Sequence, residues 1–202
     1  MLWWTASSSG RISNRCPSGR ASRRTKGRKT ADMTFLEGFE PTGFELRRAE
    51  AGDADLVRRV LCLATGWRDD EPGYELPPGH DAYHEDWGRP DDFGVVVFVG
   101  MEFVGGAYAR RVGPADGTYG FVDPDLWELS LGVEPAYRRQ GLGRLLIEAL
   151  KARSIEKGIS GLSLSVELDN PAGKLYDAAR FTIVKERDTD LLMEWRGPSS
   201  VH

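Results

Sequence analysis

The chain has 202 residues, of which 40% are hydrophobic and 10% aromatic, and this composition is typical of one globular domain with a substantial core. No apolar run approaches the roughly 20 residues that a membrane-spanning helix needs, so we expect no membrane partner. The formal net charge of −4 is uneven, because residues 1–32 are basic and the remainder is acidic. An acidic body argues against nucleic acid as the substrate and favours a cationic amine.

The N-terminal segment is basic and rich in Ser, Arg and Gly, which predicts a disordered extension over residues 1–40. A transit peptide, a nucleic-acid or membrane tether and an extension without function are all open readings, and Met33 is a candidate for the natural start. The two cysteines, Cys16 and Cys62, make no disulfide framework and no paired metal motif. We therefore expect a reducing compartment and a cytoplasmic protein.

A folded domain is predicted over residues 41–198, and its first half is expected to contain a strand, a helix and a hairpin. The strand is Phe44–Ala49, and the helix after it is capped by Asp53 and ends near Thr65. The hairpin pairs Gly94–Val99 with Glu102–Arg110, and the two glycines inside its second strand indicate a bulge or a close backbone approach.

The segment Gly66–Asp92 is broken by Pro and Gly and carries aromatic and acidic residues, as functional loops often do. His80 and His84 lie four positions apart beside acidic residues, but no metal-ligand motif is complete, and we expect no metal. The favoured interpretation is a solvated acidic loop with a short helix over Asp81–Trp87.

The second half alternates strands and helices before a closing hairpin. In order, we expect a strand at Trp127–Val133, a helix from Leu142 to Lys157, a strand at Leu162–Val166, a helix begun by Asn170 and Pro171, and a hairpin of Phe181–Arg187 with Leu191–Trp195. This order predicts an α+β fold around a mixed sheet.

A glycine-bearing loop, Arg138 to Arg144, joins the strand ending at Val133 to the long helix. Without side chains at Gly141 and Gly143, backbone N–H groups can approach an anion closely, and the helix N-terminus adds a partial positive charge. A pyrophosphate is the natural ligand of such a site. A dinucleotide-binding loop is the competing reading, but its fingerprint needs a third glycine where this chain has Leu146.

The motif Arg138-x-x-Gly141-x-Gly143, followed by Asn170-Pro171-Ala172, Leu175-Tyr176 and Phe181, resembles the GCN5-related N-acetyltransferase (GNAT) superfamily over roughly Phe44 to Trp195. The resemblance implies a central mixed, mostly antiparallel sheet flanked by helices, with strands that part around an acetyl-CoA cleft. It implies an acyl-CoA-dependent N-acyltransferase that transfers acetyl from acetyl-CoA directly to a primary amine of a small molecule or peptide.

Two alternatives remain beside this reading. One is a non-catalytic acyl-CoA-binding module that acts as a regulator or partner subunit, and the other is an acceptor amine on another protein, at its N-terminus or a lysine. Homodimers are common in the superfamily, so the resemblance allows one here.

The resemblance implies a set of residues that bind acetyl-CoA. Backbone groups of Leu131, Gly132 and Val133 would lie along the pantetheine arm, and the N–H of Leu131 would polarise the thioester carbonyl. Asn170 would cap its helix and contact the same arm. The pyrophosphate would be bound by the loop residues Arg138, Arg139, Gln140, Gly141, Leu142, Gly143 and Arg144. For Arg138 and Arg139, the alternative to phosphate binding is a position in a solvated turn.

Two residues are candidates for acid–base chemistry. Glu128 is the candidate general base, and an outward-facing strand residue is its alternative. Tyr176 is the candidate general acid for the leaving thiolate, and a packed core tyrosine is its alternative.

The binding site for the acceptor amine would include residues of the irregular segment Gly66–Asp92 and of the later acidic turn that contains Asp123 and Asp125. The candidates for substrate binding are Trp67, Tyr74, Asp123 and Asp125. The superfamily usually has Gly before the aromatic residue where this chain has Arg180, which predicts a remodelled turn.

Overall fold

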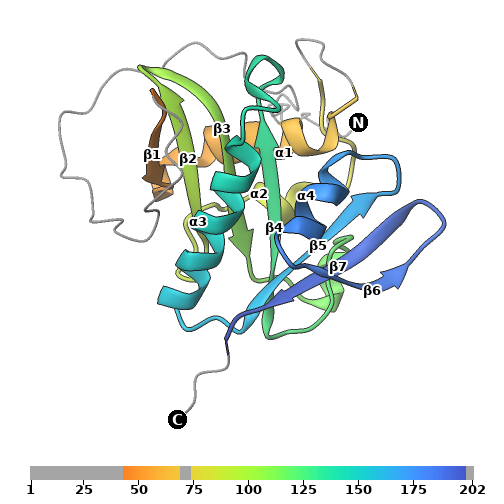
Figure 1. The fold of residues 1–202 in the computed structure, drawn as a ribbon. Coiled ribbons are helices and arrows are strands. Elements are labelled where there is room, and N and C mark those ends of the chain that lie inside the picture. The colour runs from red at the N-terminus through yellow and green to blue at the C-terminus, as the bar shows by residue number, and fades with distance from the viewer. Residues whose placement is uncertain (1–42, 69–73, 199–202) are drawn as a thin grey trace, which may run out of the picture.

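The computed structural model describes residues 43–68 and 74–198, and within these ranges seven strands form one sheet. The strand order is β1-β2-β3-β4-β5-β7-β6, and each neighbouring pair is antiparallel except β4 with β5 (Figure 1). The predicted mixed, mostly antiparallel sheet is therefore confirmed, and the parallel sheet of a dinucleotide-binding fold is excluded. The predicted extension over residues 1–40 and the candidate start at Met33 lie outside the described residues.

The first part of the sheet is an antiparallel meander of β1 (Glu45–Arg48), β2 (Phe93–Val99) and β3 (Glu102–Arg110). The register shifts between Val97 and Phe98, which leaves a bulge in β3 beside Gly105. A Cβ added at Gly106 would lie 2.8 Å from Val60 Cγ2, so the chain also approaches helix α1 closely there. Both predictions made for the paired glycines are confirmed.

Strands β4 (Leu126–Val133) and β5 (Gly161–Glu167) are parallel neighbours that part along their length. Their pairing runs only from Leu126, opposite Gly161, to Glu128, opposite Ser163. Among the described strands, none pairs with β4 on that side beyond Glu128. This is the predicted split in the sheet.

The sheet closes with a C-terminal hairpin of β6 (Thr182–Glu186) and β7 (Asp190–Arg196). Strand β7 pairs with β5 over the whole length of β5, from Gly161 to Glu167, and β6 forms the outer edge. The hairpin predicted at the end of the chain is confirmed.

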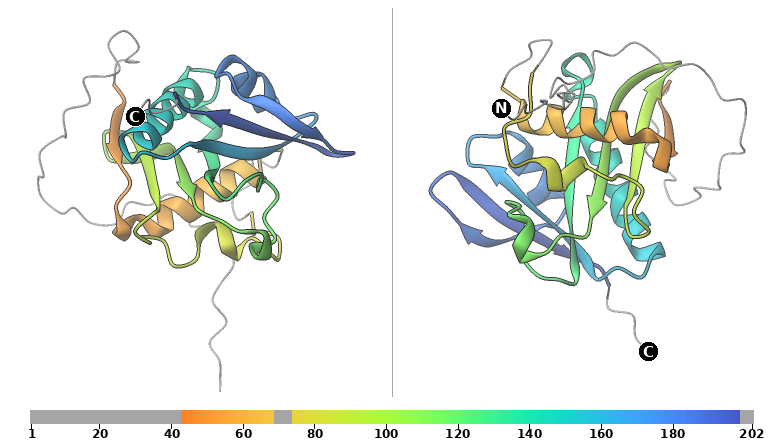
Figure 2. Two further views of the ribbon diagram at one scale, coloured as in Figure 1. Left: turned by 90° about the horizontal axis from the view of Figure 1, so that it is seen from below. Right: turned by 180° about the vertical axis from the view of Figure 1, so that it is seen from behind.

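Helices cover both faces of the sheet (Figure 2). Helices α1 (Ala54–Thr65) and α2 (Asp81–His84) lie on one face, and α3 (Leu142–Glu156) and α4 (Ala172–Ala178) lie on the other (Figures 1 and 2). Short 3-10 turns complete the chain at Ala51–Asp53, Pro114–Asp116 and Pro135–Tyr137. None of the described helices combines the length and apolar content that crossing a bilayer requires.

Two local expectations about helix ends are wrong. The Asp53 carboxylate does not cap α1, because it accepts hydrogen bonds from Arg47 Nη1 at 2.6 Å and from the Glu50 N–H at 2.7 Å. The turn after α4 is not remodelled, because Arg180 adopts the left-handed conformation itself, with φ of +63°. The Phe181 N–H then donates to the Tyr176 carbonyl at 3.0 Å.

Helix α1 also carries Cys62, whose side chain is buried against the sheet. The structure records its sulfur as disulfide-bonded and not as a free thiol. The expectation of a chain without a disulfide is therefore wrong.

Candidate active site

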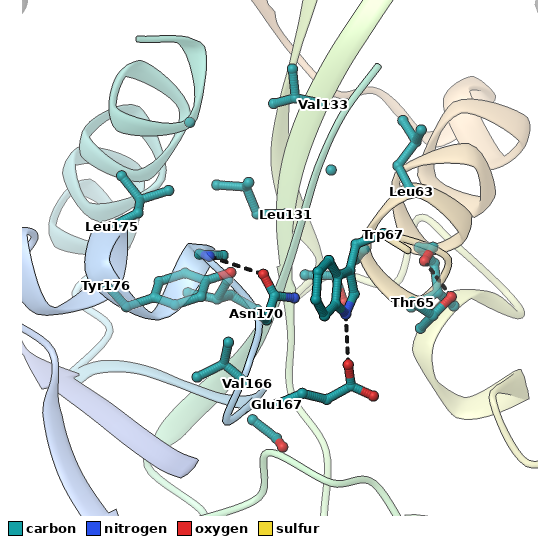
Figure 3. Close-up of a pocket in the computed structure, with 18 of the residues that line it drawn as sticks. Leu63, Thr65, Trp67, Leu131, Val133, Val166, Glu167, Asn170, Leu175 and Tyr176 are labelled. Atoms are coloured by element: carbon teal, nitrogen blue, oxygen red, sulfur yellow. Dashed lines mark hydrogen bonds between the residues drawn. The ribbon is translucent and has the colours of Figure 1, made fainter. Parts of the chain in front are cut away.

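A pocket of about 840 Å³ opens where β4 and β5 part, between the end of α1 and the first turns of α3 and α4 (Figure 3). The structure brings most of the predicted site residues to its lining: Trp67, Tyr74, Glu128, Leu131, Gly132, Val133, Arg138, Arg139, Gly141, Gly143, Arg144, Asn170 and Tyr176. Four others are not part of the lining: Asp123, Asp125, Gln140 and Leu142. Asp123 instead lies 3.7 Å from Arg196 in an ion pair.

The edge of β4 that faces the pocket presents backbone groups that pair with no neighbouring strand. The N–H of Glu134 donates to the Val104 carbonyl on β3 at 2.9 Å. Because backbone groups alternate in direction along a strand, those of Leu131 and Val133 point the other way, into the gap. In Figure 3 their side chains flank this gap. An extended ligand with amide groups can pair here as an added strand does, which is what the pantetheine arm of coenzyme A requires.

Gly132 has a structural reason to be glycine that the sequence did not reveal. A Cβ at this position would lie 2.5 Å from the Val60 carbonyl oxygen and 2.6 Å from Leu63 Cβ. The missing side chain therefore lets α1 pack directly on β4, opposite the open edge.

The glycine-bearing loop turns sharply before α3. Arg139 has φ of +62° and Gly141 has φ of +87°, and both lie in the left-handed region. Leu145 is the first residue of α3 whose N–H bonds back to the loop, at the Gly141 carbonyl, 3.1 Å away. Within the described residues, no backbone carbonyl accepts from the preceding N–H groups of the helix. These N–H groups and the positive end of the helix dipole are suited to a phosphate.

Gly143 connects the loop to α4. A Cβ at Gly143 would lie 2.8 Å from Leu175 Cδ2, so the glycine allows the two helices to meet at the pocket. The two glycines of the motif thus differ in role: the first permits the turn, and the second permits the helix contact.

The three arginines of the loop are placed differently. Arg138 Nε donates to the Val133 carbonyl at 3.1 Å, and Nη1 donates to the Trp67 carbonyl at 3.3 Å. Arg138 therefore ties the end of β4 to the end of α1. Arg139 and Arg144 are exposed at the loop, where their guanidinium groups can reach a phosphate.

Asn170 and Tyr176 face the pocket from the other side (Figure 3). Asn170 Oδ1 accepts from the Ala172 N–H at 2.9 Å, which confirms the predicted contact at the start of the helix. Tyr176 is 6% exposed and packs edge-on against Phe181, with ring centroids 5.7 Å apart. Burial raises the pKa of its phenol above the usual range, so the hydroxyl keeps its proton.

Glu128 is buried rather than turned outward, which excludes the alternative reading of this residue. Its side chain is 4% exposed. Oε1 accepts from the Tyr83 hydroxyl at 2.8 Å and from the Gly120 N–H at 2.7 Å. The polar face of β4 therefore lies under α1 and α2 and not in bulk water.

The environment of Glu128 favours its neutral form. Burial raises the pKa of the carboxyl above its usual value. The hydrogen bonds from Tyr83 and Gly120, the nearby Thr118 hydroxyl and the positive charge of Arg187 lower the pKa but leave it raised. A carboxylate with a raised pKa is a stronger base than an exposed one, as a general base near neutral pH needs to be.

The lining residues that the sequence analysis did not assign to the site include Tyr83, Tyr119 and His80. The His80 ring stacks on Tyr83 with centroids 5.6 Å apart and lies 5.8 Å from the Tyr119 ring. Their positions depend on how α2 packs, and no local pattern signals that. Among the described residues, no group of three or more His, Cys, Asp or Glu side chains is arranged to bind a metal ion.

The mouth of the pocket is bridged by an ionic and aromatic cluster. Trp67 Nε1 donates to Glu167 Oε2 at 2.6 Å, and the Arg68 guanidinium lies 4.3 Å from the Trp67 ring centroid. Arg68 also pairs with Glu167 and Asp169, each at 2.5 Å. The cluster links the end of α1 to the loop after β5.

A sheet that opens over the N-terminus of a helix, with unpaired backbone groups on one strand, is the architecture of a fold that binds an acyl thioester. Comparison with known proteins identifies the family. The model of the acetyltransferase (GNAT) family matches residues 62–180, and the chain belongs to this family.

Curated relatives agree with this assignment. Mycothiol acetyltransferase of Corynebacterium aurimucosum is 30% identical over 162 residues, which cover 76% of this chain and 49% of that protein. The chain thus spans about half the length of the curated relatives that it matches, 49% and 55% in two cases.

Solved structures share the fold. The GNAT domain of S. lividans PAT superposes with a TM-score of 0.56 at 24% identity, over 75% of this chain and 89% of that one. The putative acetyltransferase yncA from Salmonella typhimurium, solved with acetyl-CoA, superposes with a TM-score of 0.57 at 18% identity, over 79% of this chain and 97% of that one.

Proposed function

We propose that this protein is an acetyl-CoA-dependent N-acetyltransferase that transfers acetyl directly to a primary amine of a small molecule or peptide. One observation carries the proposal. The N-terminus of α3, the open edge of β4, Glu128 and Tyr176 all border the same pocket. A phosphate site, a thioester site, a base and an acid are the parts that this reaction needs.

The donor would lie across the split in the sheet. The N–H groups at the start of α3, with Arg139 and Arg144, would bind the pyrophosphate. The backbone of Leu131 and Val133 and the Asn170 side chain would bind the pantetheine arm. Acetyl-CoA is the substrate that this arrangement fits, and the proposal uses no metal ion.

The acetyl transfer would proceed in one displacement sequence. Glu128 accepts a proton from the ammonium of the acceptor, directly or through a water molecule, and the neutral amine attacks the thioester carbon. The N–H of Leu131 stabilises the negative charge that develops on the carbonyl oxygen. The carbon–sulfur bond then breaks, and Tyr176 protonates the leaving thiolate. The attacking nitrogen loses its second proton to solvent as the amide forms, and the Tyr176 phenolate takes a proton back from solvent.

The acceptor would enter on the side of α2, where the pocket is aromatic and acidic. Trp67, Tyr74 and His80 line this side, with Glu128 behind them. Aromatic faces and a carboxylate attract a cationic amine. Relatives named mycothiol acetyltransferase support an N-acetyltransferase. Asp123 and Asp125 receive no role in the proposal, since they are not part of the lining.

A non-catalytic acyl-CoA-binding module is the less favoured function. The family match and the named relatives both point to transfer of acetyl, and the pocket contains a buried carboxyl with a raised pKa that binding alone does not need.

Location and assembly are part of the proposal as well. We infer a cytoplasmic protein, because the acetyl-CoA that it would use is a metabolite of that compartment. This inference rests on the donor alone, since the disulfide at Cys62 removes the argument from the cysteines. A homodimer through β6 is consistent with its position at the sheet edge, where all of its residues are exposed. Light scattering on the purified protein measures the assembly, and a mass of one chain contradicts the dimer.

A thiol-release assay tests the function. The purified chain is mixed with acetyl-CoA and a panel of amines that includes cysteinyl, aminosugar, polyamine and peptide acceptors. We expect release of free CoA with at least one amine, accompanied by an added acetyl mass on that amine. Binding of acetyl-CoA in calorimetry without release for any amine would favour the binding module instead.

A further inference from the structure

The hydroxyl of Tyr83 bonds to two residues, Glu128 and Tyr119, that are both distant from Tyr83 in sequence. It donates to Glu128 Oε1 at 2.8 Å and accepts from the Tyr119 N–H at 2.7 Å. Tyr83 is 7% exposed and is held on α2 by packing against Leu61 and Leu76. Its ring also stacks under His80.

We propose that Tyr83 is a positioning residue that orients the Glu128 carboxylate, anchoring Oε1 and leaving Oε2 to accept the proton of the acceptor amine. This inference rests on the proposed role of Glu128 as the base, and it adds a residue and an oxygen atom that the proposed mechanism does not specify.

The hydrogen-bond directions follow from the donors available. A phenol has one proton, and the Tyr83 oxygen already accepts from a backbone N–H, so its own proton points to Glu128 Oε1. The Gly120 N–H donates to the same oxygen at 2.7 Å. With two donors on Oε1, a proton on the carboxyl belongs on Oε2.

Oε2 is the atom left for that proton. Within the described residues Oε2 is buried and makes no hydrogen bond of good geometry. The Thr118 hydroxyl oxygen is also buried and likewise makes none. A buried carboxylate oxygen without a full partner is costly in a fold. A water molecule that enters beside Oε2 when the acceptor binds would satisfy this oxygen and relay the proton to it.

Other charged groups near Glu128 are already engaged. Arg110, opposite Glu128 in the register of β3, binds Asp92 at 2.8 Å. Arg187 binds Asp190 at 3.0 Å and the Tyr119 carbonyl at 2.9 Å. The titratable groups that face this region from the packed elements are Tyr83 from α2 with His80 just before it, Tyr108 and Arg110 from β3, and Arg187 and Asp190 from the β6–β7 hairpin. Of these, Tyr83 is the side chain that bonds to the carboxylate.

Gly120 also contacts the Glu128 carboxylate closely. A Cβ added there would lie 2.6 Å from Oε1. The change Gly120→Ala would therefore displace the carboxylate without removing a titratable group, and it provides a second way to disturb the same orientation.

The test is the pH dependence of kcat/KM for the acceptor in the full chain. Tyr83→Phe removes a donor that favours the ionised carboxylate, so the pKa of Glu128 rises and the acidic limb moves to higher pH. One hydrogen bond to a charged group corresponds to a shift of about one pH unit, or about a tenfold loss of kcat/KM on that limb. Gly120→Ala is expected to lower kcat over the whole pH range, while the affinity for acetyl-CoA stays unchanged in both variants.

Tyr137→Phe is the matched control, because it also removes a phenol hydroxyl from a carboxylate, Glu102, 3.1 Å away. Its acidic limb should stay where it is in the parent protein. Glu128→Gln should remove the limb and most of the turnover. If Glu128→Gln keeps both, the proposed base is wrong. If Glu128→Gln loses both while the Tyr83→Phe limb matches that of Tyr137→Phe, the base stands and the positioning role is overturned.

Discussion

The indole N–H of Trp67 donates to Glu167 Oε2 at 2.6 Å and so joins the end of α1 to the end of β5 across the pocket (Figure 3). The two residues are 100 positions apart in sequence. Trp67 follows α1, which packs on β4, and Glu167 is the last residue of β5. The contact therefore spans the gap where β4 and β5 part, and it links the proposed acceptor side of the pocket to a strand that borders the proposed donor site.

Trp67→Phe should weaken acceptor binding more than folding. The variant keeps an aromatic ring but loses the hydrogen bond that fixes the orientation of the ring at the pocket, so we expect a rise of about threefold in the KM of the amine. The free energy of unfolding should change by less than about 1 kcal/mol, because the bond is exposed. Steady-state kinetics and urea unfolding measure the two quantities. Glu167→Gln, which keeps an acceptor oxygen for the indole, should raise KM less, and an equal rise in both variants would contradict this account.

Tyr176→Phe should lower turnover and leave donor binding intact. Loss of a general acid typically lowers kcat by about 100-fold or more, while the packing against Phe181 survives in the variant. Because burial raises the pKa of Tyr176, the residue should cause no alkaline limb near its ordinary value. Single-turnover kinetics and calorimetry with acetyl-CoA separate the effects. Unchanged single-turnover rates would leave Tyr176 as a packing residue.

The buried Glu128 carboxyl should lower the free energy of unfolding as pH rises. Its pKa is raised in the fold, so its contribution to stability is present below the pKa of the unfolded chain and is lost as pH rises through the folded value. Glu128→Gln removes the charge and keeps an oxygen that can accept from Tyr83 and Gly120. The variant should gain stability relative to the parent between pH 5 and pH 8, about 1.4 kcal/mol for each unit by which the pKa is raised. Urea unfolding of the parent and the variant at pH 5 and pH 8 measures this gain. The same difference in free energy at both pH values would contradict the destabilisation by a buried charge.

Arg180→Gly should stabilise the protein. Arg180 has φ of +63°, a conformation that costs a residue with a Cβ about 1 kcal/mol and a glycine almost nothing. Part of this gain is lost because glycine is freer in the unfolded chain, so we expect about 0.5 kcal/mol in urea unfolding. Arg180→Ala keeps the strained backbone and removes the exposed charge, so it should show no gain. Equal gains in both variants would assign the effect to the charge.

Local signals in the sequence were sufficient for most of the helices and strands and for the conformation of the glycine-bearing loop. The alternation in Trp127–Val133, the helical spacing after Leu142 and the Asn170-Pro171 start each depend on neighbours in sequence, and all three are confirmed. The left-handed turn at Gly141 follows from the same local chemistry. Asp53 was assigned wrongly because Arg47, six positions earlier on β1, binds its carboxylate.

Only the tertiary structure decided what surrounds the reactive groups. Glu128 reads equally as an outward or an inward residue along its strand, and it is buried because α2 places Tyr83 beside it from 45 positions away. Gly132 and Gly143 are glycines because helices α1 and α4 approach them, which no spacing along the chain can indicate. The hydrogen bonds of helices and turns join residues a few positions apart, so the local sequence indicates them. Burial, and with it the pKa of the candidate base, depends on which distant surfaces meet.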